Sequence, residues 1–91
     1  MTPTEFPKFI DAIRQLQQAY FVEENPAEKL KISENFSYYL GEKMGGDLTV
    51  FFQEAWPEYP FMYSLLLCDK QLLKLLERFY RHLWESQQET Q

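Results

Sequence analysis

The sequence predicts an all-α protein, a small antiparallel bundle of three to four helices in a single domain. Apolar residues recur every three or four positions toward both ends of the chain, which is the spacing of one helix face. Proline and glycine signals at 25–26 and 45–46 separate the segments between them. The 91 residues are 45% hydrophobic and 18% aromatic, so the chain has enough apolar surface to build one core and to fold alone.

The first helix is predicted from about Thr4 to Glu24. Thr4 is the expected N-cap, and it places Pro7 at the third helical position, where a missing N–H costs nothing. The Asn25-Pro26 pair ends the helix, because the residue before a proline avoids the α region. The apolar face consists of Phe6, Phe9, Ile10, Ile13, Leu16 and Tyr20.

The second helix is predicted from Pro26 to Met44, with Asn25 as its N-cap and proline at its first position. Its early part alternates apolar and charged residues, as a strand does, so a break near Ser33 is the alternative. Helical spacing then returns over Ile32, Phe36, Tyr39, Leu40 and Met44. Two glycines, Gly45-Gly46, close the helix because glycine takes the left-handed conformation without a Cβ clash.

A third helix is favoured from Asp47, the expected N-cap, to Trp56. Its stripe of Leu48, Phe51, Phe52, Ala55 and Trp56 falls at i, i+3, i+4, i+7 and i+8. A strand over Leu48–Phe52 is the alternative, because these residues are rich in β-formers, although a strand would separate Phe51 from the other apolar side chains. Two prolines then predict a short extended link over residues 56–60. We expect Trp56 to be buried and Tyr59 to be exposed.

The last helix is predicted to run unbroken from about Phe61 to Glu85. Asp69 and Lys70 interrupt its apolar run but lie away from the centre of the stripe. Basic residues gather toward its C-terminal end, where positive charge interacts favourably with the helix dipole. Residues 86–91 are polar and are predicted to fray, which leaves about 4–85 ordered. The stripe consists of Phe61, Leu65, Cys68, Leu72, Leu76, Phe79 and Leu83.

The charge and composition exclude several classes of protein. A net charge of −5 and a pI near 4.8 argue against nucleic-acid binding, which needs basic residues to neutralise phosphates. The single cysteine, Cys68, forms no internal disulfide and is expected to be a small buried residue. The N-terminus lacks the pattern of a secretory signal, and no apolar run approaches the roughly 20 residues of a membrane span. We therefore expect a cytoplasmic protein without a membrane partner.

The sequence also lacks the residue patterns of an enzyme. Its one histidine, His82, lies fourteen residues after Cys68 in the predicted last helix, which separates their Cα atoms by about 21 Å. A nucleophile and its base must approach to about 3 Å. The chain has neither the paired ligand spacing of a metal site nor a glycine-rich phosphate loop. We expect no catalytic activity, cofactor or metal site. An enzyme using carboxylates alone is a remaining alternative, and it would require a pocket lined by several acids.

The most informative feature is an acidic and aromatic region in the middle of the chain. Residues 23–58 hold eight acidic side chains and three lysines, whereas residues 61–84 carry a net positive charge. The ordinary interpretation is a solvated surface. The functional interpretation is a binding surface for a basic protein, because opposite charge steers encounter and aromatic side chains supply hot spots. Its expected residues are Glu42, Asp47, Glu54, Trp56, Glu58, Tyr59 and Tyr63.

We therefore predict a small acidic protein-binding module, of the adaptor, inhibitor or immunity type. The alternative is a structural homo-oligomer, at least a weak homodimer, that associates through the leucine-rich last helix. The apolar residues of that helix cover more of its surface than one small core requires. The residues expected to form this contact are Leu73, Leu75, Tyr80 and Trp84.

Overall fold

A computed structural model describes residues 1–89, and this part of the chain contains five helices and no strand. The prediction of a small all-α bundle is confirmed. The segment 48–52 is helical, as favoured, and the second helix passes through Ser33 without a break. The helices are α1 (Phe6–Val22), α2 (Pro26–Met44), α3 (Asp47–Ala55), α4 (Tyr63–Cys68) and α5 (Leu72–Glu89).

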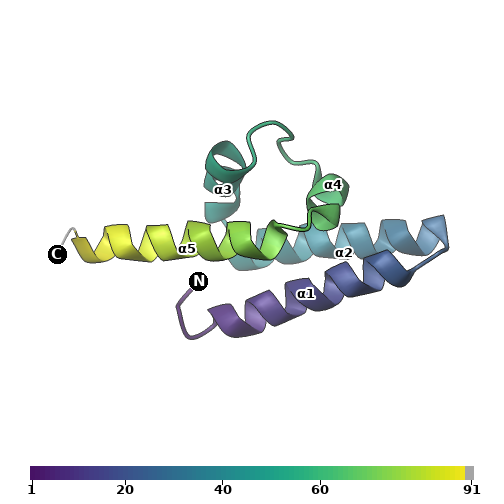
Figure 1. The fold of residues 1–91 in the computed structure, drawn as a ribbon, viewed down its shortest axis with the longest axis horizontal. Coiled ribbons are helices and arrows are strands. Elements are labelled where there is room, and N and C mark those ends of the chain that lie inside the picture. The colour runs from purple at the N-terminus through teal and green to yellow at the C-terminus, as the bar shows by residue number, and fades with distance from the viewer. Residues whose placement is uncertain (90–91) are drawn as a thin grey trace.

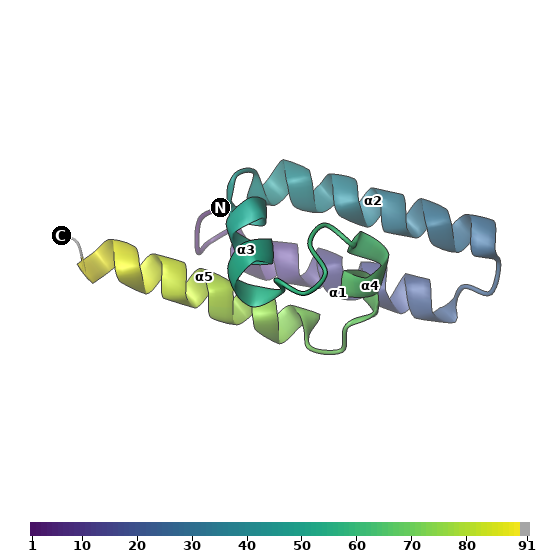
Figure 2. The same ribbon diagram turned by 90° about the horizontal axis from the view of Figure 1, so that it is seen from above.

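The first two helices, α1 and α2, form an antiparallel pair (Figure 1). The short helix α4 packs against both of them, toward the end of the pair where their connecting loop lies (Figure 2). The helix α3 packs against α2 and α5, and α5 continues past the N-terminal end of α1. The molecule is therefore elongated, with extents of 50 × 27 × 21 Å.

Aromatic side chains from every long helix meet in the core. The rings of Phe51 and Phe79 join α3 to α5 edge to face, with centroids 5.5 Å apart. Phe9 and Tyr80 join α1 to α5 in the same way at 6.5 Å. Such pairs contribute about 0.5–1.5 kcal/mol beyond the apolar area they bury. The buried core consists of Phe9, Ile10, Ile13, Phe36, Leu40, Met44, Leu48, Phe51, Phe52, Leu66, Leu67, Leu72, Leu76, Phe79 and Tyr80.

The helix starts follow the sequence signals only in part. Asn25 caps α2 as predicted, because its side-chain oxygen accepts the backbone N–H of Ala27 at 2.9 Å. The prediction that Thr4 caps α1 is wrong, because α1 begins at Phe6 and its N-cap position is Glu5, which makes no side-chain cap bond. Asp47 is likewise the first residue of α3 rather than its cap, which leaves its carboxylate free for another contact.

The prediction of one unbroken last helix is wrong, because the chain breaks between α4 and α5. At the break, Asp69 is extended and its Oδ1 accepts the backbone N–H of Gln71 at 2.7 Å. An aspartate that bonds the backbone two residues on competes with the helix ladder. From α1, the Gln17 amide donates to the carbonyl oxygens of Leu67 and Asp69, both at 3.0 Å. The carbonyl of Leu67, which lacks a helical partner at the end of α4, is thereby satisfied, whereas that of Asp69 also accepts the backbone N–H of Leu72 at 3.1 Å.

The break changes which side chains are buried in this part of the chain. Leu66 and Leu67 face the core, whereas Phe61, Leu65 and Cys68 are exposed, although the sequence placed all three on the buried stripe. Beyond the predicted end at Glu85, α5 continues to Glu89, and residues 90–91 of the segment expected to fray lie outside the described residues. Among residues 1–89, none of the helices is both long and apolar enough to cross a membrane.

Candidate functional site

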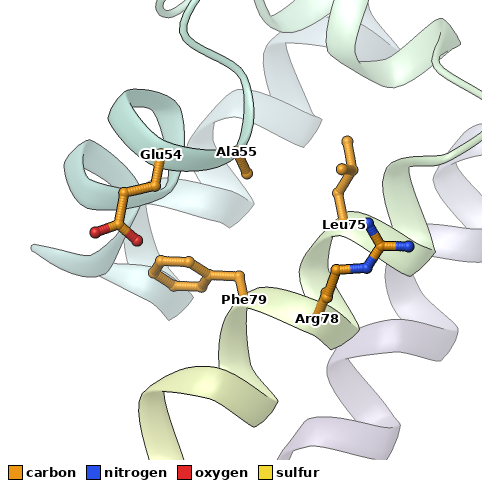
Figure 3. A pocket seen from close by; sticks show the side chains of 5 residues that line it. All are labelled: Glu54, Ala55, Leu75, Arg78 and Phe79. Atoms are coloured by element: carbon orange, nitrogen blue, oxygen red, sulfur yellow. The ribbon is translucent and has the colours of Figure 1, made fainter. Parts of the chain in front are cut away.

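Four of the predicted partner-binding residues come together where α3 ends and the proline link begins. Two hollows lie there and share Ala55 in their linings. The first has a volume of about 280 Å³, lies between α3 and α5, and is lined by Glu54, Ala55, Leu75, Arg78 and Phe79 (Figure 3). The second has a volume of about 230 Å³ and is lined by Ala55, Trp56, Pro57, Glu58 and Tyr59.

The second hollow is built around two aromatic rings. The centroids of Trp56 and Tyr59 are 5.2 Å apart, with their planes tilted by 46°. Trp56 is half-buried, and its indole Nε1–H donates to Oδ2 of Asp69 at 3.1 Å, which ties the end of α3 to the break before α5. Tyr59 is 44% exposed, in agreement with the prediction for this side chain. Because Pro57 fixes its own φ and lacks an N–H, the helix ends here and the link turns outward.

The exposed apolar surface extends beyond the predicted residues. Phe61 is 51% exposed, Met62 47% and Leu65 44%. Phe61 lies over the buried ring of Phe52, with centroids 4.8 Å apart, and Phe52 also contacts Trp56 at 6.3 Å. Phe61 and Trp56 therefore both pack on the buried ring of Phe52, and Tyr59 packs on Trp56. The exposure of Phe61 and Leu65 was not predicted, because their spacing placed them on the buried stripe of one continuous helix, and no sequence signal indicated that Met62 would be exposed.

We call this region the link surface. Its two glutamates are exposed, and the ion pairs formed by the described residues, Asp11–Arg14 and Glu28–Lys31, both lie elsewhere. No basic residue occupies the last turn of α3, whose carbonyl end carries a partial negative charge. The link surface is therefore both apolar and negatively charged. It consists of Glu54, Trp56, Glu58, Tyr59, Phe61, Met62 and Leu65.

The other predicted partner-binding residues lie apart from the two hollows. Tyr63 is half-buried and packs edge to face on Phe52 at 5.5 Å, and burial raises the pKa of its hydroxyl. The carboxylate of Asp47 accepts the hydroxyl of Tyr80 at 3.2 Å. Glu42 is exposed on α2 and lines neither hollow. Tyr63 and Asp47 therefore make contacts within the fold.

The residues predicted for self-association differ in their exposure. Tyr80 is fully buried, so its side chain is not presented on the surface of the monomer. Burial raises the pKa of its hydroxyl, and the charge and hydrogen bond of Asp47 act in the same direction. Leu73, Leu75 and Trp84 are half-buried on α5, and Trp84 packs edge to face on Phe6 at 5.4 Å.

Potential catalytic and metal-binding groups are scattered. Cys68 ends α4 and His82 lies on α5, and both are exposed. Burial is the main cause of a raised pKa at Tyr20, and the neighbouring Cys68 thiol adds to it. Within residues 1–89 there is no group of three or more His, Cys, Asp or Glu side chains placed to hold a metal ion. Comparison with protein-family models, with curated proteins and with solved structures finds no match for the chain.

Proposed function

We propose that the protein is a small binding module that recognises a basic protein through the link surface. One observation carries the proposal: exposed aromatic and methionine side chains are grouped with two unpaired glutamates at the negative end of a helix. Aromatic residues and methionine are enriched in protein interfaces, and aromatic side chains there often dominate the binding energy. A module of this kind acts as an adaptor, an inhibitor or an immunity-type protein.

The grouping of the exposed apolar side chains supports a binding role. The described chain exposes nine large hydrophobic side chains, and four of them lie within residues 59–65. Single exposed hydrophobic residues are normal, whereas a contiguous apolar patch is typical of an interaction site. Phe61 also holds a left-handed backbone, with φ of 59°. That conformation is unfavourable for a bulky residue by about 1–3 kcal/mol, and such strain is concentrated at functional sites.

The charge of the molecule supports a basic partner. The whole chain has a net charge of −5, and the acidic groups of the link surface lack basic neighbours at ion-pair distance in the described structure. Opposite charge accelerates diffusional encounter, and salt screens this effect. We expect the association rate with the partner to fall as ionic strength rises.

Affinity capture from the native cell with matched variants tests the proposal. The double variant Tyr59→Ala/Phe61→Ala removes two exposed rings of the link surface. Tyr38→Ala is the control, because Tyr38 is 74% exposed on α2 and lines neither hollow. We expect a basic protein to be captured by the wild type and the control and lost by the double variant. Equal capture by all three proteins would contradict the proposal.

Self-association along α5 is a second candidate. It is favoured by the partial exposure of Leu73, Leu75 and Trp84. A hollow of about 500 Å³ also lies beside Trp84, between α5 and the N-terminal segment at Pro3 and Phe6. Sedimentation velocity at high micromolar concentration tests this candidate, since a pure monomer under those conditions would count against it.

A further inference from the structure

We propose that the 230 Å³ hollow beside Trp56 and Tyr59 binds one arginine side chain of the basic partner. The inference rests on the proposed function and specifies which group of the partner the link surface recognises. It assigns the second hollow to a guanidinium, which would lie against the tilted pair of Trp56 and Tyr59 rings and beside the carboxylate of Glu58.

The size of the hollow suits a side chain. Sites for small-molecule ligands usually begin at roughly 300 Å³, which is larger than this hollow of about 230 Å³. Its lining combines the planar rings of Trp56 and Tyr59 with Pro57 and Ala55, and its exposed surface is about half apolar and half polar. Glu58 supplies the only charged side chain of this lining.

Three features of the hollow favour a cation. The faces of tryptophan and tyrosine rings attract positive charge. Glu58 is exposed and takes part in neither of the ion pairs that the described residues form. The lining includes Trp56, the C-cap residue of α3, so the hollow lies at the negative end of that helix. All three features act in the same direction.

Elsewhere in the protein, two tyrosine rings have a lysine side chain beside them. Lys29 lies over the ring of Tyr20 at 4.3 Å, and its Nζ also donates to the carbonyl of Tyr20. Lys43 lies 5.9 Å from the ring of Tyr39. In the described structure, the rings of Trp56 and Tyr59 have an acidic neighbour but no lysine or arginine over them. A cation supplied by a partner would complete the same arrangement.

An arginine fits this hollow better than a lysine. The guanidinium is planar and stacks on aromatic faces, and its forked N–H groups match a carboxylate. It is also more weakly hydrated than an ammonium, so less hydration is lost on entering a partly apolar hollow. The tilted pair of rings and the single carboxylate of Glu58 provide both kinds of contact.

The hollow is held in place before a partner arrives. The indole of Trp56 is fixed by its hydrogen bond to Asp69 and by its contact with the buried ring of Phe52. Pro57 and Pro60 restrict the backbone on both sides of Tyr59. A preformed site loses less conformational freedom on binding, which favours affinity.

Titration with small probes tests the inference directly. The chain has two tryptophans, so the Trp84→Phe variant assigns the indole N–H signal of Trp56 in a ¹H–¹⁵N NMR spectrum. The probe is N-acetyl-L-arginine amide, and N-acetyl-L-citrulline amide is its neutral counterpart of similar shape. We expect a saturable shift of the Trp56 signal at millimolar concentrations of the arginine probe, and binding of the citrulline probe that is at least about fivefold weaker.

Variants locate the binding. Tyr59→Ala and Glu58→Gln should each weaken binding of the arginine probe by about twofold to fivefold, as expected for one cation–π contact or one exposed charge pair. Tyr38→Ala and Glu34→Gln remove an exposed ring and an exposed acid of α2, and they should leave the probe unaffected. The same spectra report whether each variant is folded. Equal binding of arginine and citrulline probes, or equal or tighter binding of N-acetyl-L-lysine amide, would overturn the assignment.

The failure of this inference can be told apart from the failure of the proposed function. If Tyr59→Ala/Phe61→Ala loses the partner but the arginine probe does not bind, the link surface stands and the guanidinium site is wrong. If the probe binds at Trp56 while the double variant retains its partner fully, the guanidinium site stands and the proposed function is wrong.

Discussion

Replacing Gln17 by alanine should destabilise the protein by about 1–3 kcal/mol. The side-chain amide of Gln17 donates to two carbonyl oxygens at the end of α4, those of Leu67 and Asp69, both at 3.0 Å and both partly buried. A typical intramolecular hydrogen bond contributes about 0.5–1.5 kcal/mol, and two are lost together here. In a domain of this size, a loss of about 2 kcal/mol corresponds to a fall of roughly 8–16 °C in Tm.

Urea denaturation followed by circular dichroism measures the effect, and Gln18→Ala is its matched control. Gln18 is an exposed neighbour on α1, so its replacement should change the free energy of unfolding by no more than about 0.5 kcal/mol. The slope of the transition should be the same for both variants, because the surface exposed on unfolding hardly changes. If the two variants were equally stable, the claim that Gln17 holds the break between α4 and α5 would be wrong.

Two further predictions concern the hydroxyl of Tyr80 and the difference between a buried and an exposed phenylalanine. Because the pKa of Tyr80 is raised above the ordinary tyrosine value of 10.0, the stability it contributes is present below about pH 10 and is lost as the pH rises further. Urea denaturation midpoints measured from about pH 8 to 11 should therefore fall for the wild type and fall less for Tyr80→Phe. At neutral pH, Tyr80→Phe should be less stable than the wild type by about 0.5–1.5 kcal/mol, because it lacks the hydrogen bond to Asp47. An equal fall in the midpoints of both proteins at alkaline pH would contradict this. Phe51→Ala should cost about 3–5 kcal/mol in urea denaturation, because that ring is fully buried, whereas Phe61→Ala should cost less than about 1 kcal/mol. Similar losses for the two phenylalanines would show that Phe61 is a core residue.

The parts of the fold that follow from the sequence are those fixed by local spacing. The helices α1, α2 and α3 follow from apolar periodicity and from the proline and glycine signals between them. The break at Asp69 could not be predicted in this way. It depends on the Gln17 side chain, which lies fifty residues from Leu67 in the chain, and on the indole of Trp56. A continuous apolar stripe through Cys68 favoured an unbroken helix, and these tertiary contacts stabilise the break instead.

The candidate site could likewise be predicted from the sequence only in part. The exposure of Tyr59 beside two acids follows from the two prolines of the link, which end α3 and direct the chain outward. The exposure of Phe61 and Leu65 could not be read from periodicity, because Phe61 lies before α4 in a left-handed conformation and Leu65 lies on a short helix that ends at Cys68. The inward orientation of Asp47 depends on Tyr80, a residue thirty-three positions away. Local signals thus located the link surface, while tertiary contacts determined its extent.

The dissociation constant of the captured partner, measured by calorimetry for the wild type, Tyr59→Ala and Tyr38→Ala, tests the binding role of the link surface most directly. We expect Tyr59→Ala to weaken binding by about 2 kcal/mol or more, roughly 30-fold, with little change in Tm. Tyr38→Ala should bind as the wild type does, because its equally aromatic and still more exposed side chain lies outside the link surface. Wild-type affinity in Tyr59→Ala, or an equal loss in Tyr38→Ala, would contradict the proposal that this protein binds a basic partner through the link surface.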